Sequence, residues 1–366
     1  MNPTRMSRKI KFAAVSAAAL VCVAALLPAG SAVAEATEPS YRIVWDDFRD
    51  GFSTSGPDAR WSYLTVGPYV ADDGKITTSR KGLRVISGGR NPDTGEPAFT
   101  HTIAQEEDNG RGLPGTLDHV KWLTFTNHTA STGNKGFDAE PGQELSCETW
   151  MSGRTYGAGG HPFGDHVANP EIDLRLASVS MNTLDPETST VFNFFITNEQ
   201  IYAFYERLPN MRAQLGNYAA FSYAIPVADR SPHDRHHLQI SYDRSAGVTR
   251  WLVDGNEVYQ VGRLGHRLPS REHLVLDHGG EETPVEPRQL NCGMGMISVL
   301  DGELPGQSAL VRLSSADGFY FDPPTGEPDP QTFLDDESLE SNRLFGQGAG
   351  LSMSRYVVSS VPADRK

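Results

Sequence analysis

The chain of 366 residues carries 46 acidic and 32 basic side chains, which give a formal net charge of −14 at pH 7. A negative charge of this size argues against nucleic acid, an anionic membrane surface or a polyanionic substrate as the main partner, because like charges repel over the whole surface. The 36 glycines and 24 prolines are scattered between short segments, which is typical of many-stranded sheets with turns and not of long helices.

The first element in chain order is an export signal over residues 1–34. Four basic residues precede an apolar run from Phe12 to Leu27, and the first acidic residue is Glu35. The small residues of Ala32-Val33-Ala34 suit signal peptidase, so we expect cleavage after Ala34, with Ala36 as the alternative. The run of 16 residues falls short of the roughly 20 that span a bilayer. We therefore expect a secreted, extracellular protein without a membrane anchor.

Residues 35–366 predict one β-sandwich domain with long loops, because all-β domains often reach roughly 200–250 residues or more; two average domains are the alternative. Removing the signal's four positive charges from −14 leaves −18. The cysteines that remain after cleavage are Cys147 and Cys292. An even pair of cysteines in an oxidising compartment predicts one disulfide and not a catalytic thiol.

Several segments alternate apolar and polar residues, which is the pattern of strands with one buried face. The alternation predicts strands over residues 145–151, 190–196, 201–208, 237–242, 248–253 and 351–361. Short turns join the second strand to the third, and the fourth to the fifth, as hairpins. Asp254-Gly255 then predicts a tight turn into a strand over 257–261, because Asp-Gly favours the type I′ conformation.

The two ends of the mature domain are expected to meet. Segment 44–48 opens it and segment 354–359 closes it, and side-by-side pairing of these segments closes one sandwich around both termini. The stretch 72–134 is the least regular, and residues 91–97 and 106–115 within it are expected to be loops. Loops of this length are often functional.

Two parts of the sequence resemble a known superfamily. His236–Asp243 followed by Arg250–Val258 is similar to the strand, hairpin and Val-Asp-Gly turn of concanavalin A-like lectins and glucanases. Asp46-Asp47-Phe48, with Trp61 downstream, resembles the start of the laminarinase-like glycosidases. The resemblance covers most of residues 41–361 as strand pattern, and it implies an all-β jelly-roll sandwich of two antiparallel sheets with a concave glycan-binding face. The chain as a whole resembles a group of uncharacterised secreted proteins of high-GC Gram-positive bacteria, for which no activity is implied.

Glu171-Ile172-Asp173-Leu174-Arg175 resembles the first half of the Glu-x-Asp-x-(x)-Glu motif of retaining laminarinase-like enzymes. The resemblance implies that Glu171 is the nucleophile and that Asp173 tunes the carboxyl pair. On a strand, these two residues and Arg175 share one face. Arg175 stands where the second catalytic Glu is expected, and a guanidinium cannot donate a proton to a leaving group. The alternative is a non-catalytic strand on which Arg175 pairs with Glu171 or Asp173.

A hydrolase with this sequence needs its second acid from a neighbouring strand, and Glu148 and Glu206 are the candidates. Glu148 shares a strand face with Trp150, and Glu206 shares one with Tyr202 and Phe204. Aromatic faces stack on pyranose rings, and an apolar setting raises the pKa of a carboxyl group. The alternative is that these aromatic residues belong to the core.

Histidines supply the remaining candidates. Two glycines after His278 bring it near Glu281 or Glu282, as a general base with its orienting carboxylate or as a solvated turn. The pair His161 and His166 has a spacing that suits a metal, but we interpret it as a loop on the rim and expect no metal.

A polysaccharide lyase is a further alternative, with Arg175, His278 and either Tyr205 or Tyr202 as its polar groups. The charge of −18 disfavours it, because lyase substrates are polyanions. The sequence therefore predicts a secreted jelly-roll protein that binds, and in its enzymatic form hydrolyses, an extracellular poly- or oligosaccharide. We expect a monomer without a cofactor. A cell-surface or matrix protein with a vestigial cleft is the non-catalytic alternative.

Overall fold

The computed structural model describes residues 40–105, 115–320 and 331–363. The predicted signal at 1–34 and nearly all of the predicted loop at 106–115 lie outside the described residues. Within these ranges, no helix has both the length and the apolar character needed to span a membrane.

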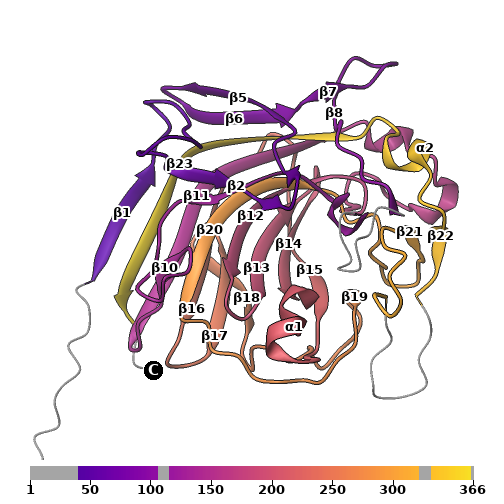
Figure 1. The fold of residues 1–366 in the computed structure, drawn as a ribbon. Helices are drawn as coiled ribbons and strands as arrows, with labels where there is room; N and C mark the ends of the chain where they lie inside the picture. The colour runs from indigo at the N-terminus through magenta and orange to yellow at the C-terminus, as the bar shows by residue number, and fades with distance from the viewer. Residues whose placement is uncertain (1–39, 106–114, 321–330, 364–366) are drawn as a thin grey trace, which may run out of the picture. The chain divides into compact units, whose positions relative to one another are not determined.

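Two large antiparallel sheets form the sandwich (Figure 1). The eight-stranded sheet has the order β18 (Asn256–Val261), β17 (Val248–Val253), β16 (His236–Asp243), β11 (Gln143–Tyr156), β23 (Gly348–Pro362), β6 (Gly82–Ser87) and β5 (Gly74–Ser79), with β1 (Tyr41–Asp46) on β23. The nine-stranded sheet has the order β19 (Leu274–Asp277), β15 (Phe221–Asp229), β14 (Gln200–Arg207), β13 (Thr190–Ile196), β12 (Ser178–Asp185), β20 (Gln289–Ile297), β9 (Val120–Thr126) and β2 (Trp61–Tyr63), with β10 (Phe137–Asp138) on β20.

Short elements decorate the sandwich. The two-stranded pairs are β3 (Thr65–Val66) with β4 (Tyr69–Val70), β7 (Gly89–Arg90) with β8 (Pro97–Ala98), and β21 (Ala309–Val311) with β22 (Phe333–Asp335). The helices are the single turns α1 (Arg212–Leu215) and α2 (Glu340–Arg343) and the 3₁₀ turns Gly115–Leu117, Ala158–Gly160, Gly164–His166 and Pro209–Met211.

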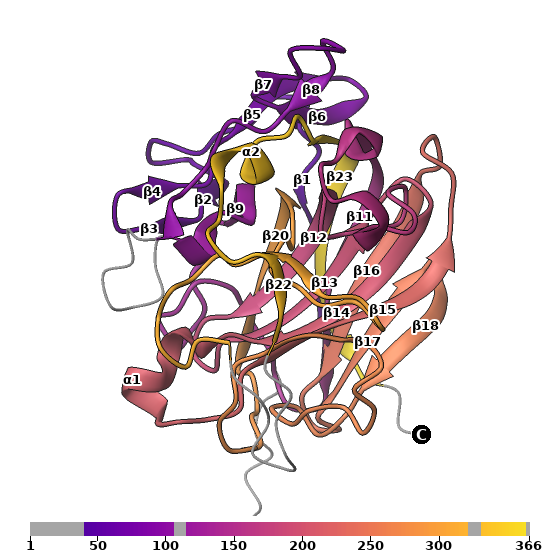
Figure 2. The same ribbon diagram turned by 90° about the vertical axis from the view of Figure 1, so that its right-hand side faces the viewer.

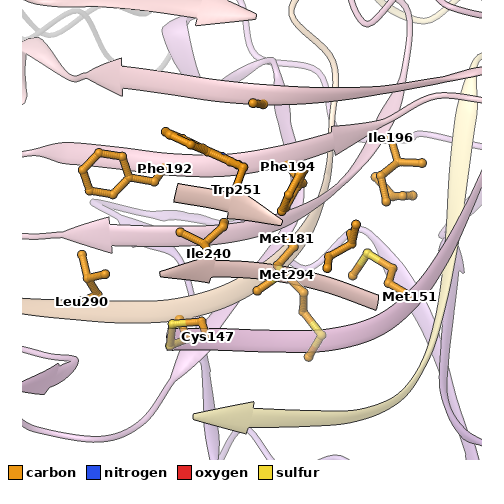
Figure 3. Close-up of a cluster of buried hydrophobic side chains, with 14 of the residues drawn as sticks. Cys147, Met151, Met181, Phe192, Phe194, Ile196, Ile240, Trp251, Leu290 and Met294 are labelled. Carbon is orange, nitrogen blue, oxygen red and sulfur yellow. A yellow bond between two sulfur atoms is a disulfide. The ribbon is translucent and has the colours of Figure 1, made fainter. Parts of the chain in front are cut away.

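The core lies between the sheets, where alternate residues of both point inward (Figure 3). Met151 of β11, Met181 of β12 and Phe194 of β13 are fully buried there, and removal of such apolar surface from water is the main stabilising term in folding. The Cys147–Cys292 disulfide joins β11 to β20, and thus one sheet to the other, with its Cα atoms 6.0 Å apart. The predicted disulfide is confirmed.

The predicted all-β jelly-roll sandwich of the concanavalin A-like class is confirmed, as are both hairpins. Asp254 and Gly255 have φ angles of 53° and 81°, the left-handed pair that a type I′ turn requires. The predicted pairing of the two ends is also present, since Val44 of β1 lies opposite Val357 of β23.

The strand predicted around Glu171 is wrong, because residues 170–176 form consecutive turns before β12. Side chains hold these turns: Asn169 Oδ1 accepts a hydrogen bond from the Glu171 N–H, and Asp173 Oδ1 accepts one from the Arg175 N–H. Asn and Asp side chains of this kind compete with the hydrogen bonds of a sheet. Four long strands, β9, β12, β15 and β20, were not predicted, and β9 and β20 are buried along their whole length.

Candidate functional site

The broken motif does not form a carboxyl pair. Glu171 Oε2 accepts a hydrogen bond from Asn198 Nδ2 at 2.6 Å. Arg175 is fully buried and binds both carboxylate oxygens of Asp173, with the shortest contact at 2.6 Å. Its guanidinium also donates to the carbonyl oxygens of His166 and Ser308. Arg175 therefore anchors the turn segment, and the Asp173–Arg175 ion pair is the alternative that the sequence offered.

Glu148 and Trp150 lie on the outer face of the eight-stranded sheet. Glu148 accepts hydrogen bonds from Arg42 at 3.0 Å and from His237 Nε2 at 2.8 Å. The Trp150 ring stacks on the His237 ring of β16, with centroids 4.1 Å apart, and the Arg355 guanidinium of β23 lies 4.0 Å from the Trp150 centroid. Because β11 runs between β16 and β23, both faces of the indole are covered. The structure does not bring this group together with Glu206.

Glu206 lies on the outer face of the nine-stranded sheet, together with Tyr202 and Phe204. It pairs with Ser222 of β15, which in turn pairs with Leu276 of β19. Ser222 Oγ donates a hydrogen bond to Glu206 Oε1 at 2.5 Å. Glu206 is partly exposed, and burial raises its pKa to about 7, with the charge of Asp301 adding to the shift.

Asp301 reaches this face from a segment over residues 298–308, which we call the crossing segment. The Val299 N–H donates to the Leu174 carbonyl, and the Glu303 N–H donates to the Val275 carbonyl of β19. The segment thus runs from the end of β20 to the other edge of the sheet, and Figure 2 shows it on the outer side of the central strands. Its residues and those around Leu174 cover the apolar side chains Phe195, Tyr202, Phe204 and Ala224.

Asp301 is 2% exposed, and burial raises the pKa of its carboxyl group to about 7. Its Oδ2 accepts a hydrogen bond from the Tyr320 hydroxyl at 3.0 Å. The charge of Asp301 on the crossing segment adds to the raised pKa of Glu206 on the sheet, and the charge of Asp118 adds to the raised pKa of Asp301.

Two histidines, His278 and His119, have pKa values lowered by burial. Burial lowers the pKa of His278 to about 4, and its Nδ1 bonds the Phe319 carbonyl at 2.7 Å. Burial and the charges of Lys121 and His278 lower the pKa of His119 to about 4. Both rings are therefore neutral at pH 7, where they are hydrogen-bonding groups without charge. The sequence suggested that His278 pairs with Glu281 or Glu282. Both of these side chains are exposed, whereas the His278 ring is buried and bonds the Phe319 carbonyl.

The buried polar atoms near this face that have no hydrogen-bond partner among the described residues include His119 Nδ1, Asn182 Oδ1, Ser298 Oγ and Asp301 Oδ1. Buried polar atoms are almost always paired with protein or with ordered water.

The polar groups of the lyase alternative are separated. Tyr205 points into the core, where its hydroxyl accepts from the Gly265 N–H and donates to the His266 carbonyl. The Tyr202 hydroxyl donates to the Ile172 carbonyl at 2.8 Å. Arg175 is held by Asp173 as described above.

His161 and His166 lie in the loop before the turns at 170–176, where His161 Nδ1 accepts from the Phe163 N–H. Across the described ranges, no three His, Cys, Asp or Glu side chains gather in a way that would hold a metal ion.

Sequence reasoning singled out Glu206 and His278 as candidates, but it did not point to Asp301, Tyr320 or His119. Asp301 and Tyr320 lie in irregular segments, so no periodic pattern marks them. Only the path of the crossing segment over the sheet brings Asp301 to Glu206.

Comparison with known proteins shows that the chain is similar in sequence to the uncharacterized protein L829 of Acanthamoeba polyphaga mimivirus. It is 29% identical over 83% of this chain and 84% of its own length. Among solved structures, the chain is similar to an endo-1,3-beta-glucanase from Streptomyces sioyaensis, with a TM-score of 0.42 and 11% identity over 88% of this chain and 96% of that one. It is also similar to the catalytic domain of a laminarinase from Thermotoga petrophila RKU-1, with a TM-score of 0.38 and 12% identity over 90% and 99%. A family of unknown function (DUF6081) matches residues 45–362, and the chain belongs to this family.

Proposed function

We propose that the chain binds an extracellular polysaccharide on the outer face of the nine-stranded sheet and hydrolyses it with Glu206 and Asp301. The observation that carries the proposal is that two carboxyl groups with raised pKa values, Glu206 on a strand and Asp301 on the segment that crosses the sheet, lie close enough for the charge of Asp301 to raise the pKa of Glu206. The Cys147–Cys292 disulfide supports an oxidising, extracellular setting.

The two carboxyl groups take different roles because their exposures differ. Glu206 is partly exposed and, in its protonated form, donates its proton to the glycosidic oxygen as the bond from that oxygen to the anomeric carbon breaks. Asp301, in its ionised form, stabilises the positive charge that develops at the anomeric carbon. A water molecule then adds its hydroxyl to that carbon and returns a proton to the carboxyl pair. The Ser222 hydroxyl and the Tyr320 hydroxyl each orient one of the two carboxyl groups.

The test is the release of reducing sugar from β-glucans, xylans and galactans by the full chain. Glu206→Gln is expected to reduce the rate by about 10²–10⁴-fold, because a positioned proton donor is worth that much. Glu148→Gln is the matched control on the other sheet, and it should keep the wild-type rate. Because Glu206 must be protonated and Asp301 ionised, the wild-type rate should be highest near pH 7 and fall as the pH moves above or below that value. Release by Glu206→Gln at the wild-type rate would overturn the assignment.

A non-catalytic binding protein is the second candidate. The crossing segment covers the rings of Phe195, Tyr202 and Phe204, so these rings offer no open face on which a sugar stacks. This candidate predicts that wild type and Glu206→Gln are retained equally on an insoluble glycan and that neither releases sugar.

A further inference from the structure

A pocket of about 200 Å³ lies at the β19 edge of the nine-stranded sheet. Its lining combines charged side chains with apolar ones: Arg271, Glu272, Leu274, Val275, Leu276, Asp277, Glu303, Leu304, Pro305, Gly306 and Gln331. The crossing segment forms one wall and β19 forms another. Such a pocket has room for a single sugar ring or a ligand of similar size.

The pocket at β19 lies two strands from Glu206 of β14 in the same sheet. Leu276 lines the pocket and pairs with Ser222, whose hydroxyl bonds Glu206. Glu303 also lines the pocket, and it follows Asp301 by two residues on the crossing segment. A chain-like ligand that reaches Glu206 and Asp301 therefore meets the pocket across one further strand.

The charges of the lining decide which ligand suits it. Arg267 contacts the Asp277 carboxylate at 2.8 Å and Arg271 contacts it at 3.1 Å, so the charge of Asp277 is compensated. The lining holds three carboxylate side chains, Glu272, Asp277 and Glu303, and one guanidinium, that of Arg271, and this balance disfavours uronate, sulfate and phosphate groups. Carboxylates and a guanidinium beside leucine and proline side chains offer hydrogen bonds to hydroxyl groups and an apolar surface to the C–H face of a ring.

We infer that this pocket is a subsite for one uncharged sugar unit of the same polysaccharide, next to the position of the bond at Glu206 and Asp301. The inference rests on the proposed function and adds to it a second binding position and the exclusion of acidic sugars. Long fragments fill both positions, whereas a disaccharide at the carboxyl pair leaves the pocket empty.

The test compares the affinity of the full chain for hexasaccharide and disaccharide fragments of β-glucan, xylan and galactan. Arg271→Ala removes a hydrogen-bond donor, and Glu272→Trp fills the pocket from its exposed rim. Each is expected to weaken hexasaccharide binding by about tenfold or more, as the loss of a charged hydrogen bond does, and to leave disaccharide binding unchanged. Arg288→Ala is the matched control, since the Arg288 and Arg271 side chains are 48% and 52% exposed and each pairs with a carboxylate.

Wild-type affinity for hexasaccharides in both pocket variants would overturn the subsite while the proposed function stands. Equal or tighter binding of oligogalacturonate fragments, lost in Arg271→Ala, would overturn the exclusion of acidic sugars. If the wild type binds no fragment at all, the proposed function fails and the subsite fails with it.

Discussion

Burial acts in opposite directions on the titratable groups at the outer face of the nine-stranded sheet. It raises the pKa of Glu206 and Asp301 to about 7, because a carboxylate loses hydration there. It lowers the pKa of His119 and His278 to about 4, because a charged imidazole loses hydration in the same way. The face thus keeps its groups neutral over most of the range from pH 4 to pH 7.

The raised pKa of Asp301 predicts a stability that falls as the pH rises. Between the ordinary carboxyl pKa, near 4, and about 7, the folded chain binds a proton that the unfolded chain has released, so increasing pH favours unfolding. Asp301→Asn removes this group. Between pH 5 and pH 8, we expect the free energy of unfolding of the variant to fall by about 2–4 kcal/mol less than that of the wild type. Urea unfolding at each pH measures the difference.

Glu148→Gln, which removes a carboxyl group from the other sheet, is the control for this comparison. Parallel stability curves for Asp301→Asn and the wild type would contradict the assignment. The two histidines have the opposite effect on the free energy of unfolding. Because burial lowers their pKa, the folded state loses stability as the pH falls from about 6.5 to about 4. The histidines therefore change the stability only below about pH 6.5 and do not contribute to the loss of stability above pH 7.

At the scale of elements, the close approach of β11 to β12 depends on a glycine. A Cβ atom on Gly153 would lie 2.1 Å from Val179 Cγ2, which is far inside van der Waals contact. Gly153→Ala is therefore expected to lower the free energy of unfolding by about 1–3 kcal/mol, as overpacking of a core does. Urea unfolding measures the change. Gly159→Ala is the control, because open space surrounds that position, and an equal effect of the two substitutions would contradict the argument.

The alternation of apolar and polar residues in the sequence predicted those strands that have one side facing the core and one side that is more exposed. In β17 the residues alternate between buried and half-buried positions, so the sequence shows the period of two. In β9 and β20 every residue is buried, so no alternation marks these strands. The turns at 170–176 were misread for a different reason, since Glu171, Asp173 and Arg175 have strand spacing but Asn169 and Asp173 hold the chain in turns.

At the scale of the whole molecule, the Cys147–Cys292 disulfide joins the two sheets across 145 residues of sequence. The disulfide lowers the conformational entropy of the unfolded chain, and the resulting stabilisation of the fold grows with the length of the closed loop. The double variant Cys147→Ala/Cys292→Ala is expected to lose about 2–5 kcal/mol of unfolding free energy. Guanidinium unfolding of the variant, and of the wild type with and without reductant, measures the loss. Equal stability of the variant and the oxidised wild type would show that the disulfide contributes nothing.

The sequence by itself determined the class of fold, the pairing of the two ends and the disulfide. These follow from local signals: the period of two in the strands, the Asp254-Gly255 turn and the even count of cysteines. It also placed Glu206 on one face with Tyr202, because alternation along a strand fixes which residues share a face.

Only the tertiary structure decided which carboxyl groups meet. Glu148 and Glu206 have similar sequence surroundings, yet they lie on the outer faces of different sheets, and the sequence does not state which sheet a strand joins. Asp301 joins Glu206 because the crossing segment runs from β20 to β19, and such a contact between distant segments depends on packing and not on any local pattern.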